Sequence, residues 1–158
     1  MAVWQFDFYI LKKENIKFYD ELKPWASDER NENLLIWNNK ELNIDSIDKI
    51  SKLLPKEKSW SNEIEQFGNI DSTCLQILHL ENGDCQISFK LDLRDLDRYI
   101  LLVILEFINL HDAGIVYDNK CYQLDETLFD NLLENSNAKK FCNNPYEFLK
   151  SIKKDQIN

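Results

Sequence analysis

The first regular pattern in the chain is an alternation of apolar and polar side chains over residues 3–11. The apolar side chains occupy every second position: Trp4, Phe6, Phe8 and Ile10. A period of two places such residues on one face of a half-buried strand. Because no turn residues precede this strand, we expect it to lie inside a sheet.

The clearest predicted element is a β-hairpin over about residues 73–91. Its two arms flank Asn82-Gly83, a dipeptide that favours the positive φ angles of a two-residue type I′ turn. A two-residue turn at this point pairs Leu80 with Cys85. The resulting register places these residues on the core face: Cys74, Leu78, Leu80, Cys85, Ile87, Phe89 and Leu91. It also puts Cys74 and Cys85 at opposite ends of the hairpin, too far apart for a disulfide.

Apolar residues at helical spacing predict a helix between the first strand and the hairpin. Either Asn43 or Asp45 can serve as its N-cap, and Pro55 ends it. Its apolar stripe consists of Ile44, Ile47, Ile50, Leu53 and Leu54. Short strands are predicted on either side of this helix, at residues 34–37 and 63–67.

The segment after the hairpin predicts a helix that is apolar on nearly every side. It runs from a cap within Asp92–Asp95 to about Leu110. A helix of this composition is either buried in a core or has a second partner. Two short strands around Asn119-Lys120 follow it. The last three helices are expected after Asp125, around Phe141 and from Pro145 onward.

Together these elements predict an α+β fold with a mostly antiparallel sheet. The hairpin lies at the centre of the sheet, and the helices pack on one of its faces. We expect one domain over residues 1–158, since no repeat or internal boundary is visible in the sequence. A chain of this length buries enough surface to fold without a disulfide or a metal.

The charge of the chain narrows the classes of partner. It carries 28 acidic and 19 basic residues and a formal net charge of −9. Such a surface repels nucleic-acid phosphates and anionic lipids, so we expect neither nucleic acid nor membrane as a partner. It attracts basic proteins and accelerates their encounter at low ionic strength. A requirement for solubility alone also accounts for this charge.

The sequence offers no pattern for a cofactor or metal site. Its four cysteines form no C-x-x-C pair, and His79 and His111 are the only histidines, so no zinc-ligand spacing is present. Three isolated glycines exclude a phosphate-binding loop and a dinucleotide fingerprint. The N-terminus lacks the features of a signal peptide, and the apolar stretch Tyr99–Leu110 is too short to cross a bilayer. We therefore expect free thiols in a reducing cytoplasm.

One segment has two chemical interpretations. Asp92, Arg94 and Asp95 concentrate charge between a strand and a helix. Paired aspartates can bind a metal or act as acid and base. Helix capping and ion pairs explain the same residues in structural terms, and we favour this explanation. We likewise expect structural roles for the two histidines, and we predict that the protein is not an enzyme.

Exposed aromatic residues near carboxylates are the best candidates for contact with a partner protein. Aromatic anchors are typical of protein interfaces, and carboxylates suit a basic partner. The tryptophans that lie in polar surroundings are Trp25, Trp37 and Trp60. The acidic candidates are Asp28, Glu29, Glu32, Glu63 and Glu65. The alternative is that the tryptophans fold back over the sheet and that the acidic residues belong to solvated loops.

Several short stretches together resemble small bacterial immunity proteins, which neutralise polymorphic or contact-dependent growth inhibition toxins. They are Trp4-Gln5-Phe6-Asp7-Phe8-Tyr9, Ser59-Trp60-Ser61 followed by Gly68, Asp92-Leu93-Arg94, and Ser136-Asn137-Ala138-Lys139-Lys140-Phe141 with Asn144-Pro145 and Phe148-Leu149. The resemblance implies a cytoplasmic inhibitor of one toxin domain. Such toxins are often basic nucleases, which suits an acidic inhibitor. The resemblance transfers no individual binding residue.

The sequence leaves three hypotheses. The first is an immunity-type protein that binds a basic toxin domain. The second is a non-catalytic interaction or regulatory subunit of a larger assembly, which the apolar helix before Leu110 suggests. The third is an enzyme with a carboxylate site around Asp92 and Asp95.

Overall fold

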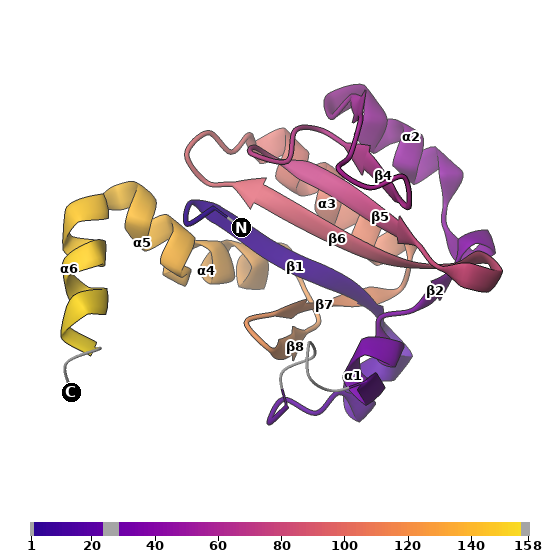
Figure 1. The fold of residues 1–158 in the computed structure, drawn as a ribbon, viewed down its shortest axis with the longest axis horizontal. Helices are drawn as coiled ribbons and strands as arrows, with labels where there is room; N and C mark the ends of the chain where they lie inside the picture. Colours follow the sequence, from indigo (N-terminus) through magenta and orange to yellow (C-terminus); the bar gives the residue numbers. More distant parts are fainter. Residues whose placement is uncertain (1, 24–28, 156–158) are drawn as a thin grey trace.

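An antiparallel sheet of eight strands runs through the described part of the protein (Figure 1). The computed structural model describes residues 2–23 and 29–155. Seven strands follow one another in the order β3-β4-β5-β6-β1-β7-β8, and β2 pairs with β6. The strands are β1 (Gln5–Lys12), β2 (Trp37–Asn38), β3 (Lys56–Glu57), β4 (Ile64–Phe67), β5 (Cys74–His79), β6 (Asp84–Asp92), β7 (Ala113–Tyr117) and β8 (Lys120–Tyr122).

Strand β1 lies inside the sheet, as its sequence predicts. It pairs with β6 through its first half and with β7 through its second half. Phe6, Phe8 and Ile10 are buried on one face, and the rings of Phe8 and Phe89 stack with centroids 5.4 Å apart. The alternation of apolar and polar residues therefore marks a central strand with one face in the core.

The hairpin of β5 and β6 forms where it is predicted, but its register differs by one residue. Asn82 and Gly83 both have positive φ angles, 61° and 78°, yet the loop contains three residues, Glu81–Gly83. His79 therefore lies opposite Cys85, and Ile77 lies opposite Ile87. A shift of one residue moves a whole strand to the other face.

This shift changes which side chains of β5 enter the core. Leu75 and Ile77 face the helices and are buried, whereas Leu78 is half-buried and Leu80 is exposed. The prediction that Cys74, Leu78 and Leu80 lie on the core face was wrong. Because β6 keeps its phase, the expected core positions from Cys85 to Leu91 are confirmed.

The helices complete an α+β fold, which confirms the predicted class. The α-helices are α1 (Glu29–Leu34), α2 (Ile44–Leu53), α3 (Arg98–Leu110), α4 (Glu126–Asn135), α5 (Asn137–Asn143) and α6 (Pro145–Asp155). Short 3₁₀ helices are η1 (Lys13–Phe18), η3 (Asn39–Glu41) and η4 (Glu81–Gly83).

The helix starts depend on side-chain caps. Asn43, one of the two predicted caps of α2, accepts a hydrogen bond from the backbone N–H of Ser46 at 2.9 Å. Asp125 caps α4 in the same way, as predicted. The cap of α3 is Asp97 and not a residue of Asp92–Asp95, because β6 continues through Asp92.

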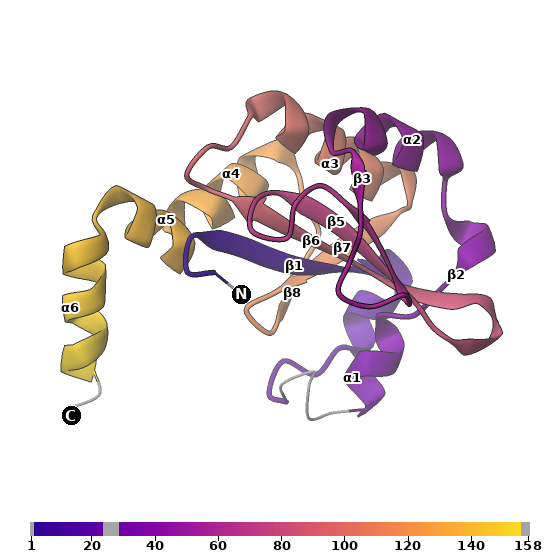
Figure 2. The ribbon, with the colours of Figure 1, turned by 45° about the horizontal axis from the view of Figure 1, so that its top comes forward.

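The main core lies between one face of the sheet and helices α2, α3 and α4 (Figures 1 and 2). Helix α3 contributes six buried side chains: Leu101, Val103, Ile104, Leu105, Phe107 and Ile108. Its outer side exposes Tyr99, Leu102 and Leu110. The helix is therefore buried on one side and retains a partly apolar surface on the other.

The other face of the sheet is covered only in part. Leu11 and Val116 pack there against Tyr19 and Leu35, which belong to the segment around η1 and α1. Next to this small cluster, a polar cross-strand row includes Gln66, Gln76, Ser88 and Tyr9. None of the helices in the described residues is long and apolar enough to cross a membrane.

Candidate functional site

Trp60 is the predicted partner-binding residue that the structure exposes most clearly. It lies in the loop between β3 and β4, and 83% of its surface is accessible. The end of this loop is fixed to β5, since the backbone N–H of His79 donates to the carbonyl oxygen of Glu63 at 2.8 Å. The loop therefore lies at the same end of the sheet as the turn between β5 and β6.

We define the tip surface as Trp60, Glu63, Leu80, Glu81 and Asp84. Glu63 and Glu81 are exposed, Leu80 is 36% accessible, and Asp84 is half-buried. The backbone N–H of Leu80 donates to the carbonyl oxygen of Asp84 at 2.8 Å, which closes the turn. Two apolar side chains thus accompany three carboxylates at this end of the sheet, on the right in Figure 1.

The tip surface has an excess of negative charge. Residues 56–65 and 79–84 contain five carboxylates and two lysines. Glu65 contacts both Lys56, at 3.3 Å, and the Nε2 atom of His79, at 3.2 Å. The pKa of the nearby Cys85 thiol is raised to about 11, first by burial and then by the charges of Asp84 and Glu41. An apolar anchor within an acidic rim matches a basic protein surface.

Glu29 and Glu32, also predicted to contact a partner, lie elsewhere. Both are exposed on α1, which packs on η1 beside the β1–β7 side of the sheet. Glu32 acts electrostatically on Tyr9, whose pKa is raised by burial, by Asp7 and by Glu32. The structure therefore groups Trp60, Glu63 and Glu65 but separates them from the acidic residues of α1. Trp25 and Asp28 fall outside the described residues.

Trp37 is not an exposed anchor, so this prediction was wrong. Only 3% of its surface is accessible, and its Nε1–H donates to the carbonyl oxygen of Ile10 at 3.1 Å. The reason is its place in the sheet. Trp37 pairs with Cys85 of β6 and therefore lies on the core face, where it meets His111 edge-on at 5.9 Å.

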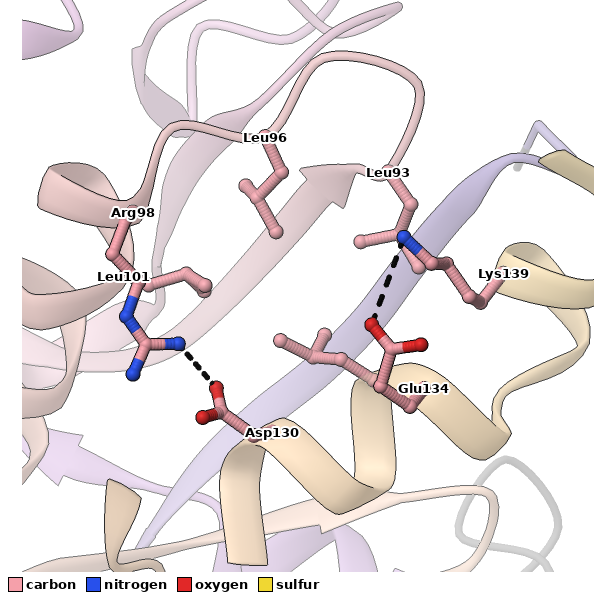
Figure 3. Close-up of a pocket in the computed structure, with 8 residues that line it drawn as sticks. Leu93, Leu96, Arg98, Leu101, Asp130, Glu134 and Lys139 are labelled. Atoms are coloured by element: carbon pink, nitrogen blue, oxygen red, sulfur yellow. Dashed lines mark hydrogen bonds and ion pairs between the residues drawn. The ribbon is translucent and has the colours of Figure 1, made fainter. Parts of the chain in front are cut away.

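A second concave surface lies between α3, α4 and α5 (Figure 3). It encloses about 340 Å³ and has a floor of leucines: Leu93, Leu96, Leu101 and Leu133. Two ion pairs border it. Arg98 contacts Asp130 at 2.6 Å, and Lys139 contacts Glu134 at 3.7 Å.

Sequence reasoning missed this pocket because its lining comes from three helices and a loop, and no local spacing connects them. Each of its two acidic side chains faces a basic one. Its apolar floor suits an aliphatic side chain of another molecule.

The Asp92 segment forms a structural network. The Asp92 carboxylate accepts hydrogen bonds from the backbone N–H of Arg94 and from its guanidinium, at 2.6 Å for the closest contact. These bonds, chiefly those of the guanidinium, lower the pKa of Asp92. Arg94 also lies over the ring of Trp4, 4.2 Å from its centroid. Asp95 is exposed and does not join this network. Within the described residues, no group of three or more His, Cys, Asp or Glu side chains is placed to hold a metal ion.

Comparison of the chain with protein-family models, curated proteins and solved structures finds no match.

Proposed function

We propose that this protein is an immunity-type inhibitor that binds a basic bacterial toxin domain in the cytoplasm through the tip surface. The observation that carries the proposal is Trp60, an indole with 83% of its surface accessible, three residues before Glu63, whose carbonyl oxygen bonds to His79 next to the acidic hairpin turn. A residue of this size gains no stability from the fold in such a position. It has a physical reason to be there if another protein covers it.

The two components of the tip surface have different roles in this proposal. The indole buries about 150–250 Å² of apolar surface when a partner covers it, and so supplies affinity. The carboxylates of Glu63, Glu81 and Asp84 attract a basic partner over several ångströms, which raises the association rate at low ionic strength. The resemblance to immunity proteins supplies the class of partner.

Co-expression tests the proposal. The product of the reading frame immediately upstream is expressed in a sensitive bacterium with and without this chain, and growth is measured. We expect the intact chain to restore growth and Trp60→Ala to reduce the protection. Ile44→Ala is the matched control, because Ile44 is 72% accessible but lies on α2. Absence of protection together with absence of binding to that product would refute the proposal.

The outer side of α3 supports a second candidate function, a subunit of a larger assembly. Tyr99, Leu102 and Leu110 are 54%, 41% and 56% accessible there. Affinity purification distinguishes the two functions. A stable complex that Leu102→Asp disrupts and Trp60→Ala leaves intact would favour the assembly over the inhibitor.

A further inference from the structure

Helix α6 contacts the rest of the protein over a small area. It packs on α5, where the rings of Phe148 and Phe141 meet edge-on at 5.9 Å. In both views the helix extends away from the sheet at the side of the molecule opposite the hairpin turn (Figures 1 and 2). Its remaining apolar side chains therefore have few partners within the described chain.

Those side chains form a stripe along α6. Tyr146, Leu149 and Ile152 are 73%, 50% and 38% accessible. The spacing of three residues keeps them on one side of a helix of this length. A solvent-facing helix gains nothing from such a stripe, so the stripe indicates a surface that another molecule covers.

A groove continues this apolar surface toward the sheet. It encloses about 360 Å³ between α6 and the ends of β1 and β7. Phe148 and Ile152 line one wall, and Val3 and Tyr117 line the other. Val3 is 50% accessible, so the exposed apolar surface extends from the helix across the groove.

Carboxylates line the groove, and α6 has a small excess of lysines over carboxylates. Asp7 and Asp118 line the groove. Lys90 contacts only one oxygen of Asp7, Oδ2, at 3.0 Å, and Oδ1 has no hydrogen-bond partner among the described residues. Helix α6 contains Lys150, Lys153 and Lys154 against Glu147 and Asp155, in a chain whose net charge is −9. Lys150 and Lys153 are exposed on α6.

We propose that the occupant of this groove is helix α6 of a second copy of this chain. The apolar stripe is symmetric about Leu149, since Tyr146 precedes it and Ile152 follows it by three residues. Two antiparallel α6 helices therefore align Tyr146 of one copy with Ile152 of the other. Each helix packs against its counterpart and against Val3 and Tyr117 of the other copy, and its lysines approach Asp118. This arrangement is a two-fold dimer with identical surfaces on both sides.

The dimer is expected to be weak and to leave the tip surface free. A helix of eleven residues is about 16 Å long and buries less area than a standard interface. We therefore expect weak association, with a dissociation constant of about micromolar or higher. The tip surface lies at the other end of β6, so this inference does not depend on the proposed function.

Sedimentation velocity of the full chain, from about micromolar to about millimolar concentration, tests the inference. We expect a monomer–dimer equilibrium whose dissociation constant rises at least about tenfold in Leu149→Asp. Leu22→Asp is the matched control, because Leu22 is 93% accessible but lies in the segment that the side chain of Asn31 of α1 holds. Leu149 is half exposed, and far-UV circular dichroism verifies that its variant folds.

A charge exchange tests the orientation of the two helices. Lys153→Glu is expected to weaken the dimer, and adding Asp118→Lys to it is expected to restore the association. A chain that stays monomeric at every concentration would overturn the inference. So would a dimer that Leu149→Asp leaves unchanged. Binding of a monomeric chain to vesicles of anionic lipid, abolished by Leu149→Asp, would also overturn it, because a membrane surface would then be the partner.

Discussion

The imidazole Nε2 of His111 accepts a hydrogen bond from the backbone N–H of Asn43 at 2.9 Å. His111 follows the last turn of α3, and Asn43 is the N-cap of α2, so this bond joins the ends of two core helices. The other ring nitrogen, Nδ1, lies 2.7 Å from the carbonyl oxygen of Phe107 and donates to it. The ring must therefore be neutral. His111 is therefore an uncharged link between the two helices.

This link predicts a loss of stability in mild acid. Burial lowers the pKa of His111 in the folded state, whereas the unfolded chain keeps a pKa of about 6.5. The contribution of His111 to the free energy of unfolding is therefore fully present above pH about 6.5. It is lost as the pH drops from there toward the lowered pKa, by up to about 1.4 kcal/mol per pH unit. Urea unfolding between pH about 5 and about 7 measures the slope. His79→Gln should retain it and His111→Gln should lose it; the reverse would contradict this role.

Two glycines with positive φ angles predict different responses to alanine. Gly83, at φ 78°, has open space where a Cβ would lie, so Gly83→Ala should cost about 1–2 kcal/mol through backbone strain alone. At Gly68, φ is 84°, and a Cβ would lie 2.4 Å from the carbonyl oxygen of Thr73. Gly68→Ala should therefore cost about 3–4 kcal/mol. Equal losses in chemical denaturation would show that Gly68 is not tightly packed.

The four thiols predict an order of reactivity. Cys74 and Cys85 are fully buried, and burial is the main cause that raises their pKa values to about 12 and about 11. Cys121 is half-buried with a pKa of about 12. Cys142 is also half-buried, and its pKa is raised mainly by burial. Because thiolates react, Cys142 should be alkylated first and Cys74 last. Mass spectrometry of the native protein after timed labelling gives the order, and early labelling of Cys74 would indicate an opened sheet.

The contacts of Asp92 predict that its substitution destabilises the protein, whereas substitution of its neighbour Asp95 does not. Only 5% of Asp92 is accessible, and its carboxylate holds the guanidinium of Arg94. Asp92→Asn removes this charge and should lower the free energy of unfolding by about 1–3 kcal/mol. Asp95→Asn, at an exposed site, should change stability little. Because the pKa of Asp92 is lowered, its contribution is present above pH about 4 and is lost as the pH falls toward that lowered value. Thermal unfolding measures both variants, and equal effects would contradict the proposed network.

Local patterns were sufficient for most elements of the fold. The alternation around Phe6 and Phe8 predicted a central strand, and the caps Asn43 and Asp125 predicted two helix starts, because each depends on neighbouring residues alone. The hairpin register depends on whether Glu81 joins the turn. Asn82-Gly83 supports positive φ angles in a loop of two residues and in one of three, so the sequence did not decide between the two lengths.

The candidate site could be predicted only in part. Trp60 and Glu63 are three residues apart in the sequence, and the structure exposes both, whereas Glu65 is half-buried. Trp37 has equally polar neighbours in the sequence, but pairing with Cys85, 48 residues away, buries it. The groove beside α6 also depends on contacts between distant segments, which a period of two or of 3.6 residues does not reveal.

Isothermal titration of this chain with the protein encoded immediately upstream tests whether the tip surface binds a basic toxin domain. We expect a complex whose affinity falls at least about tenfold in Trp60→Ala and is unchanged in Ile44→Ala. The affinity should fall with rising ionic strength, and further when Glu63 and Glu81 are both changed to Gln. Equal affinities for Trp60→Ala and the intact chain, or binding without any dependence on ionic strength, would contradict the claim that an indole within an acidic rim forms the binding surface.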